Sequence, residues 1–314
     1  MRNWTADVEV DAALAHFLVC ECWPEFAGPL PLFAGQGWDN KCFLYEEPQI
    51  VFRFPTRQMG ADLVGPERAA LPVVAEHVEL AVPTPMFIGE PSASFPFPFT
   101  GFRFISGVTA DSVPWNEDMS RVAAPPLGAF LRQLHGIDLA DDRLERVPLD
   151  IWGKTTPEVL ATKIKPRPGQ ILSFRPDLKS FIDHCLTAFD RVAGTCEPDW
   201  TTPNVLVHGD LYPRHIVVDF GPQDWEVKGV IDWGDAHIGS AASDLSLGWT
   251  LFDYRTRPLF WEAYGQVPSE EMAKRARLRA AMYGFSLLAY GLDVDDRPAA
   301  GLGFRALQNV LLEG

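Results

Sequence analysis

The chain has 314 residues, with 27 Lys and Arg against 42 Asp and Glu, so its formal net charge is −15. This charge argues against a nucleic-acid-binding surface, which needs a basic patch, and it favours cationic partners through long-range attraction. No apolar run approaches the ~20 residues that span a bilayer, and acidic residues interrupt the N-terminus where a secretory signal would be apolar. We therefore expect a cytoplasmic protein with no membrane or nucleic-acid partner.

The first third of the chain is predicted to form one helix followed by several strands. Residues 7–19 carry apolar side chains at helical spacing. Three strands are predicted, over residues 30–34, 42–45 and 50–54. The first two are joined by a turn that contains Gly35 and Gly37, which allow backbone N–H groups to face phosphate oxygens. A plain hairpin is the alternative interpretation of this turn.

Arg53 is a cation inside an otherwise apolar strand. It is flanked by Phe52 and Phe54, but because side chains alternate along a strand it shares a face with Val51 instead. A charged residue in such a place needs an oppositely charged partner or a ligand. An ordinary surface ion pair is the alternative interpretation.

The middle of the chain passes from extended connections to helices. Prolines are dense in residues 81–98, which predicts turns and extended segments, and residues 99–105 are predicted to form a strand. Two later stretches have helical periodicity, an apolar run that ends at His135-Gly136 and the amphipathic segment 177–193. Residues 150–175 are predicted to be a loop-rich insertion, whose basic residues include Lys154, Lys163, Lys165 and Arg167.

Residues 205–235 hold two apolar runs that are each followed by an acidic cluster. The first run leads into His208-Gly209-Asp210 and the second into Asp232-Trp233-Gly234-Asp235. We interpret the runs as short strands whose ends present Asp210, His215 and Asp232 to one small volume. Acceptors that converge from separate loops suit one divalent cation, since Mg²⁺ usually takes one or two carboxylates and completes its shell with substrate phosphates.

The order of these residues resembles that of known kinases. Asp210 is followed five residues later by His215, and Asp-Trp-Gly begins at Asp232, which is similar to the catalytic Asp, metal-binding Asn and Asp-Phe-Gly of protein kinases. HGDLYPRH and VIDWGD resemble the aminoglycoside phosphotransferase family more closely. Within it, a His in place of the Asn is similar to macrolide phosphotransferases and aminoglycoside 2″-phosphotransferases. Upstream segments match in the same order, namely GWDN, VFRFP, the Glu67 segment and FTGFRFISG.

The resemblance implies an α+β, two-lobed, protein-kinase-like fold. A small lobe with an antiparallel sheet is expected over residues 1–105 and would bind the nucleotide. A larger, mostly helical lobe is expected over residues 106–314, with the hinge at about 99–107. The implied activity is transfer of the γ-phosphoryl of ATP or GTP, with Mg²⁺, to a hydroxyl of an antibiotic-like acceptor, foremost an aminoglycoside or a macrolide.

The same resemblance implies a role for each motif residue. Asp210 would be the catalytic base, and His215 with Asp232 would hold Mg²⁺. Arg53 matches the kinase strand Lys that contacts nucleotide phosphate, and its implied partner is Glu67, in a stretch predicted to be helical over residues 65–77. The remaining residues implied to contact the nucleotide are Gly35, Gly37, Phe102, Arg103, Phe104 and Ile105. Asp244 is implied to brace the catalytic loop, which His208 would support through hydrogen bonds.

Two other functions fit parts of the pattern. The cluster of His208, Asp210, His215 and Asp232 could belong to a metal-dependent hydrolase, but the upstream segments would then have no role. A nucleotide-binding pseudokinase would explain Arg53 and His215 in place of Lys and Asn, but not the retention of both aspartates. A protein kinase is disfavoured because no Ala-Pro-Glu follows Asp232.

The acceptor is expected to be a small hydroxylated molecule, cationic in charge, bound by a monomer. Acidic residues in the second lobe would suit its ammonium groups; they are Asp235, Asp253, Glu262, Asp293, Asp295 and Asp296. Aromatic residues near the C-terminus, Tyr283 and Tyr290 among them, would equally suit the apolar bulk of a macrolide.

Overall fold

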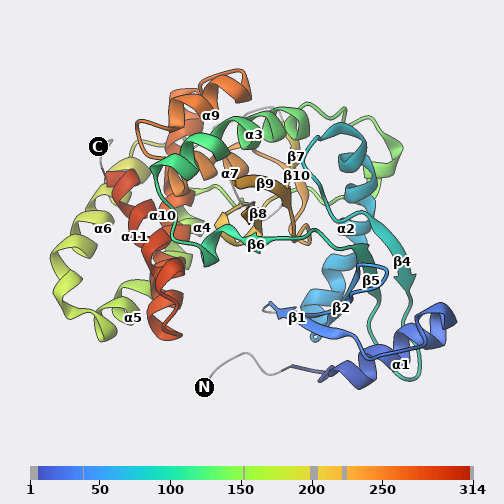
Figure 1. The fold of residues 1–314 in the computed structure, drawn as a ribbon. Helices are drawn as coiled ribbons and strands as arrows, with labels where there is room; N and C mark the ends of the chain where they lie inside the picture. The colour runs from blue at the N-terminus through green and yellow to red at the C-terminus, as the bar shows by residue number, and fades with distance from the viewer. Residues whose placement is uncertain (1–5, 38, 151–152, 199–203, 221–224, 312–314) are drawn as a thin grey trace.

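The computed structural model describes residues 6–37, 39–150, 153–198, 204–220 and 225–311. An antiparallel sheet forms the N-terminal part and helices dominate the C-terminal part (Figure 1). The mixed α+β, two-lobed, kinase-like fold expected from the sequence is therefore confirmed. The division at residues 105 and 106 stays a prediction.

The N-terminal sheet has five strands in the order β1-β2-β3-β5-β4, with every neighbouring pair antiparallel. The strands are β1 (Leu32–Gln36), β2 (Asn40–Tyr45), β3 (Ile50–Pro55), β4 (Pro85–Gly89) and β5 (Phe99–Arg103). Helix α1 (Ala12–Cys22) precedes them, and α2 (Gln58–His77) follows β3. In β3 the alternation is as predicted, because Phe52 and Phe54 are fully buried in the aromatic core whereas Arg53 lies on the other face.

Two helices of this part begin elsewhere than the sequence predicted. Helix α1 starts at residue 12 because Asp11 caps it, accepting a hydrogen bond from the Leu14 amide at 2.8 Å. Helix α2 starts seven residues before the predicted 65–77 and continues through Pro66 and Pro72. Both prolines sit inside the helix, so burial of the helix against the neighbouring core outweighs the amide hydrogen bonds that they remove.

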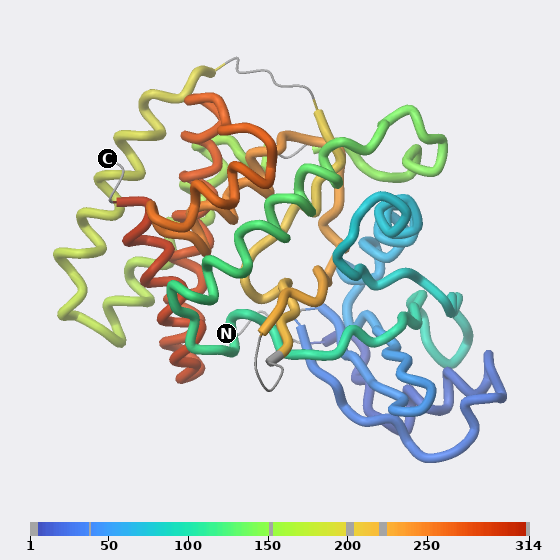
Figure 2. Tube along the Cα trace, turned by 45° about the horizontal axis from the view of Figure 1, so that its top comes forward, coloured from blue at the N-terminus to red at the C-terminus, as the bar shows by residue number. Residues whose placement is uncertain are grey.

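The C-terminal part is built mainly from helices around two small sheets. Helices α3 (Glu117–His135), α6 (Lys179–Ala193), α10 (Glu270–Asp293) and α11 (Arg297–Leu311) are its long elements, and α7 (Ala242–Leu245), α8 (Leu247–Thr250) and α9 (Arg257–Tyr264) are shorter. One sheet has the order β6-β8-β9 and the other pairs β10 with β7; the strands are β6 (Val108–Thr109), β7 (Val205–Val207), β8 (Ile216–Phe220), β9 (Trp225–Val230) and β10 (His237–Gly239). These strands lie between the N-terminal sheet and the outer helices (Figures 1 and 2).

The prediction of a loop-rich insertion over residues 150–175 is wrong for the part that the structure describes. Residues 157–164 form α4 (Pro157–Ile164) and residues 167–174 form α5 (Arg167–Phe174). A proline stands at the start of each helix, where its missing N–H costs no hydrogen bond. Leu160, Ile164 and Ile171 anchor the two helices in the core. The basic side chains of this segment are therefore carried by regular elements packed against α10.

No helix among the described residues is both long enough and apolar enough to cross a bilayer.

Candidate active site

Arg53 and Glu67 form an ion pair between β3 and α2. Nη2 of Arg53 contacts Oε2 of Glu67, and Nη1 of Arg53 lies 3.4 Å from Oδ1 of Asp232. The Glu67 side chain is 0% exposed. Burial raises the pKa of Glu67, and the adjacent Arg53 charge acts against that rise. The pair predicted from the sequence is therefore present, and it fixes the Arg53 guanidinium beside Asp232.

His215 and Asp232 converge from two different strand ends. The Nδ1 atom of His215 lies 2.8 Å from the backbone carbonyl of Asp210 and Nε2 lies 3.4 Å from Oδ2 of Asp232. Since a carbonyl only accepts, Nδ1 carries a hydrogen, and Nε2 is the ring nitrogen that faces Asp232. Asp232 itself has a left-handed backbone, with φ of 64°. This conformation turns its side chain back toward the His215 ring.

The charge of Asp232 is stabilised by its neighbours. Burial would raise the pKa of this carboxyl, but the charges of His215 and Arg53 outweigh that effect and lower the pKa below its usual value. The side chain remains 48% exposed, so it is open to a ligand from the solvent side. The Asp232 carboxylate and the Nε2 atom of His215, in its neutral form, could provide two ligands for a divalent cation.

The residues present fit Mg²⁺ better than a structural zinc site. Among the described residues, no group of three or more His, Cys, Asp and Glu side chains is arranged to hold a metal. Mg²⁺ needs only one or two protein ligands when phosphates supply the others. His208, counted with the cluster in the hydrolase interpretation, is instead buried and bonded through Nε2 to the Ile231 carbonyl at 2.9 Å.

Asp210 is held at the end of β7 by a side chain from α10. The Tyr283 hydroxyl donates to Oδ1 of Asp210 at 2.8 Å. The Asp210 amide donates to Nδ1 of His208 at 3.3 Å, so His208 supports the loop as expected. The Asp210 side chain is 32% exposed, which leaves its second oxygen accessible to a substrate.

Gly209 allows the loop to take this path. Its φ is +81°, and a Cβ atom there would lie 2.2 Å from the backbone oxygen of Asp235. Only glycine meets both the left-handed conformation and the close approach. The segments that carry Asp210 and Asp235 are therefore packed directly against each other.

Asp244 braces the loop that carries Asp210, where the resemblance placed it. Its carboxylate accepts hydrogen bonds from the amides of His208 at 2.8 Å and Gly209 at 3.0 Å, and from Nε2 of His135 at 3.2 Å. The residue is fully buried. Burial alone would raise the pKa of Asp244, but these hydrogen bonds, with that of His135 foremost, lower it below the ordinary value.

The residues predicted to contact a nucleotide line one cavity of about 320 Å³. Gly35 and Gly37 border it on one side and the segment 102–105 on another, with Arg53, His215 and Asp232 completing it. Glu67 lies behind Arg53 rather than on the cavity wall. The amide of Phe104 already donates to the Gln49 carbonyl at 2.9 Å, so a purine at this edge needs other backbone groups of the segment.

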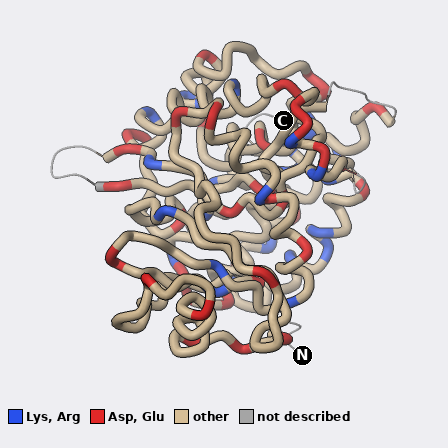
Figure 3. The backbone as a smooth tube through the Cα atoms, turned by 90° about the vertical axis from the view of Figure 1, so that its right-hand side faces the viewer, with Lys and Arg blue, Asp and Glu red and all other residues tan. Residues whose placement is uncertain are grey.

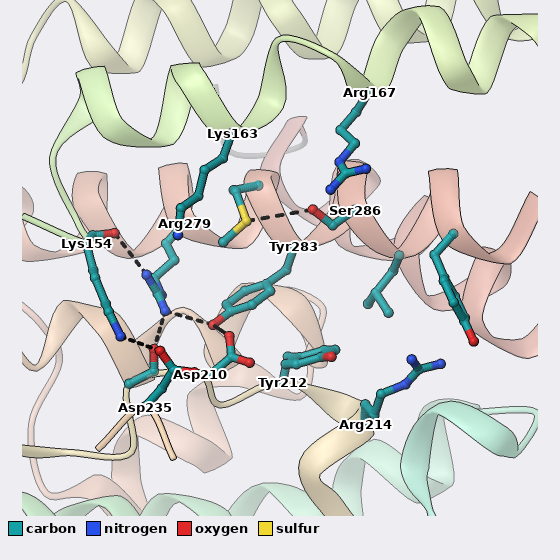
Figure 4. Close-up of a pocket in the computed structure, with 14 residues that line it drawn as sticks. Lys154, Lys163, Arg167, Asp210, Tyr212, Arg214, Asp235, Arg279, Tyr283 and Ser286 are labelled. Carbon is teal, nitrogen blue, oxygen red and sulfur yellow. Dashed lines mark hydrogen bonds and ion pairs between the residues drawn. The ribbon is translucent and has the colours of Figure 1, made fainter. Parts of the chain in front are cut away.

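A second cavity, of about 340 Å³, opens beside Asp210 (Figure 4). Its wall includes Asp210, Tyr212, Tyr283 and residues of α4 and α5. Arg214 borders both cavities, so the loop that runs from Asp210 to His215 separates them. Of the acidic residues expected to bind a cationic acceptor, Asp235 lines this cavity, and Asp293 lines a neighbouring one.

The sequence analysis missed Arg279, which lies at the centre of this second site. It is buried, and it donates to the carbonyl of Lys154 at 2.9 Å, to the carbonyl of Gly209 and to the Tyr283 hydroxyl at 2.9 Å. Figure 4 shows it between Lys163 and Asp210. One sequence signal could have found it. Arg275, Arg279 and Tyr283 recur at four-residue spacing, which places three polar groups in one row along a helix.

These features define a kinase-like site, with two neighbouring cavities that are separated by the loop from Asp210 to His215. The comparisons agree with that class. Residues 32–281 match the family described as the phosphotransferase enzyme family, and the chain belongs to it.

Solved structures of antibiotic phosphotransferases share the fold along nearly the whole chain. A GDP complex of aminoglycoside 2′-phosphotransferase-IIIa has a TM-score of 0.70 at 22% identity, covering 97% of this chain and 99% of that one. Macrolide 2′-phosphotransferase type I has a TM-score of 0.59 at 18% identity, covering 95% and 97%. An uncharacterized protein of Bacillus subtilis (strain 168), YcbJ, is 31% identical over 100 residues, which are 31% of this chain and 32% of YcbJ.

Proposed function

We propose that the protein transfers the γ-phosphoryl group of ATP or GTP to a hydroxyl of a small molecule. The observation that carries the proposal is the position of Asp210 on the wall of one cavity, which the loop from Asp210 to His215 separates from a second cavity lined by Arg53, His215 and Asp232. A phosphotransferase needs this separation, because the nucleophile must approach the phosphorus from the side opposite the leaving diphosphate.

Asp210 acts on the acceptor in this scheme. Its free carboxylate oxygen accepts the proton of the acceptor hydroxyl as the oxygen–phosphorus bond forms, and the bond between the γ-phosphorus and the β-phosphate oxygen breaks. Tyr283 keeps Oδ1 of Asp210 engaged at 2.8 Å and so fixes the orientation of the carboxylate. The nucleoside diphosphate leaves from the other cavity.

Arg53, His215 and Asp232 act on the nucleotide. Arg53, held by Glu67, offers its guanidinium to a phosphate oxygen. His215 and Asp232 would hold Mg²⁺, which when bound neutralises charge on the phosphates and orients them. The glycines at 35 and 37 leave space against the phosphates, since a Cβ atom at either would meet nothing within 4 Å.

The experiment is a coupled phosphotransfer assay with ATP and GTP, in wild type and in Asp210→Ala. We expect the variant to lose turnover while its affinity for nucleotide stays within a few-fold of wild type, because Asp210 lies outside the nucleotide cavity. Asp232→Ala should weaken Mg²⁺-dependent nucleotide binding as well as turnover. Turnover near the wild-type level in Asp210→Ala would refute the assignment of the base.

The acceptor expected from the resemblance is an aminoglycoside or a macrolide. The solved relatives include a GDP and kanamycin complex and a macrolide 2′-phosphotransferase, so both classes belong in the first acceptor screen. Neither alternative function gains support, because His208 serves the loop and both Asp210 and Asp232 are in place. The monomeric state and the cytoplasmic location stay predictions.

A further inference from the structure

The cavity next to Asp210 has a charge opposite to that of the chain as a whole. Acidic residues outnumber basic ones by 42 to 27 in the sequence, and they are spread over the molecule rather than gathered in one place (Figure 3). Among the described residues, the cavity wall carries two carboxylates, those of Asp210 and Asp235. The same wall carries five cationic side chains, those of Lys154, Lys163, Arg167, Arg214 and Arg279.

Two of the five cations are neutralised by nearby carboxylates. Lys154 lies 2.6 Å from Oδ1 of Asp235, so the second carboxylate of the wall is already engaged. Arg214 lies 2.8 Å from Oδ2 of Asp111, and its guanidinium also stacks on the ring of Tyr290 at 4.4 Å. These pairs explain part of the positive charge without a ligand.

The other three have no carboxylate partner in the described part of the chain. Arg279 donates to two backbone carbonyls and a tyrosine hydroxyl, all of them neutral. Arg167 donates to the neutral amide oxygen of Gln170 at 3.1 Å, and its Nε is buried with no hydrogen-bond partner. Lys163 makes no hydrogen bond or ion pair with any described residue. Desolvation, followed by the charges of Arg279 and Lys154, lowers the pKa of Lys163.

Lys163 and Arg167 reach the cavity from the same side. Lys163 lies near the end of α4 and Arg167 begins α5, and Figure 4 shows both extending from this segment toward α10. Asp210 and Tyr212 lie across the cavity from them. A ligand whose hydroxyl is at Asp210 would therefore place its far end against these two cations.

We propose that the acceptor carries an anionic group, a carboxylate or a phosphate, which Lys163 and Arg167 bind while its hydroxyl faces Asp210. This inference rests on the proposed phosphotransferase function and replaces the expectation of a cationic acceptor. An aminoglycoside would bring ammonium groups against unpaired cations, which like-charge repulsion and desolvation disfavour. An anion would instead give both side chains the charge-assisted hydrogen bonds that they lack.

The test compares four sugars that share a hydroxylated ring: glucose 6-phosphate, glucuronate, glucose and glucosamine. Binding is measured by calorimetry with Mg²⁺ and the imido analogue of ATP or GTP bound, so that anions do not enter the triphosphate site. We expect one or both anionic sugars to bind at least roughly tenfold more tightly than glucose, and glucosamine to bind most weakly. The first two sugars distinguish a phosphate-binding from a carboxylate-binding site.

Matched variants test whether the preference for anionic sugars arises from Lys163 and Arg167. The double variant Lys163→Gln/Arg167→Gln should lose the preference for anions and keep the affinity for glucose. Lys165→Gln removes an exposed charge from the same segment, outside the cavity wall, and should keep the preference. Far-UV circular dichroism and the affinity for the nucleotide analogue check that each variant is folded.

Three results would overturn the proposal: glucosamine binding as tightly as the anionic sugars, no binding of any of the four, or an anion preference that survives the double variant. The same measurements distinguish a failure of this proposal from a failure of the proposed phosphotransferase function. If nucleotide binds and is turned over in an Asp210-dependent manner while the sugars give any of those results, only the charge of the acceptor is wrong. If the protein binds no nucleotide, the phosphotransferase assignment itself is wrong.

Discussion

Replacing Asp244 with asparagine should destabilise the protein and lower its turnover, although Asp244 touches neither cavity. The carboxylate accepts three hydrogen bonds, at 2.8 and 3.0 Å from the amides of the catalytic loop and at 3.2 Å from His135. Asparagine keeps one acceptor oxygen and turns an NH₂ group toward at least one buried donor. Losing one charge-assisted bond and weakening the others should cost on the order of 2–4 kcal/mol of unfolding free energy.

The pH dependence of this loss identifies its cause. The pKa of Asp244 is lower in the folded protein than its ordinary value of 3.8, so ionised Asp244 contributes stability that is fully present above the unfolded pKa. That contribution is lost as the pH falls through the lower, folded pKa. The difference in stability between wild type and Asp244→Asn should therefore be constant from about pH 7 to pH 5 and shrink below about pH 4.

Urea unfolding followed by tryptophan fluorescence measures the difference at each pH, and the coupled assay measures turnover at pH 7. Asp183→Asn is the matched control, since Asp183 pairs with Lys179 on the surface, where both side chains are more than half exposed. That substitution should change stability by no more than ~0.5 kcal/mol. Equal stability of Asp244→Asn and wild type at pH 7, or a difference that does not narrow in acid, would refute the bracing role.

Three further predictions concern single contacts at the site. Tyr283→Phe removes the hydroxyl that orients Asp210, so kcat should fall roughly tenfold with nucleotide affinity unchanged, as steady-state kinetics and calorimetry would measure. Arg53→Met leaves the buried Glu67 carboxylate unpaired and should cost ~3–5 kcal/mol in urea unfolding, whereas Arg53→Met/Glu67→Gln should recover much of that stability without recovering nucleotide affinity. Gly209→Ala should cost at least ~1–2 kcal/mol through its left-handed φ and should reduce kcat by displacing the loop.

Each of these has a control or a contradicting result. An unchanged kcat in Tyr283→Phe would mean that the loop backbone alone orients the base. If the double variant at Arg53 and Glu67 binds nucleotide normally, the Arg53 guanidinium does not bind phosphate. Gly28→Ala is the control for Gly209, since a Cβ atom at Gly28 meets nothing within 4 Å and its φ is not left-handed. Gly28→Ala should keep or slightly raise stability, because alanine lowers the entropy of the unfolded chain; a loss in Gly28→Ala as large as that in Gly209→Ala would contradict the explanation by a local clash.

The fold around the first cavity could be predicted, because the sequence patterns that indicate it are either local or part of recognisable motifs. Alternation along β3 placed Arg53 opposite Phe52 and Phe54, and the structure has that arrangement. The β-branched runs before Asp210 and Asp232 predicted strand ends, and β7 and β9 end there. These residues are set by short-range pattern and chain order, so the single sequence and its resemblance to a known family were enough to predict that they lie together.

Helix boundaries and the helical nature of residues 157–174 could not be predicted in the same way. Prolines and basic residues weaken the local helical signal there, and the helices form because Leu160, Ile164 and Ile171 are buried against α10, more than a hundred residues away. In this segment, burial against the rest of the protein outweighs the weak helical propensity of the sequence. Because these helices were not predicted, the sequence did not indicate that Lys163 and Arg167 line the second cavity.

Arg279 connects the loop that carries Asp210 to the wall of the second cavity, and no sequence motif indicates this role. Its guanidinium joins the carbonyl of Gly209, in the catalytic loop, to the Tyr283 hydroxyl that holds Asp210, and to the carbonyl of Lys154 at the edge of the acceptor cavity. A buried cation costs free energy unless its donors are satisfied; the two terminal nitrogens of Arg279 are bonded, whereas its Nε is buried with no hydrogen-bond partner among the described residues. Arg279 and Tyr283 both lie on α10, so one helix holds the Asp210 carboxylate and adds a positive charge to the cavity wall that Lys163 and Arg167 also line.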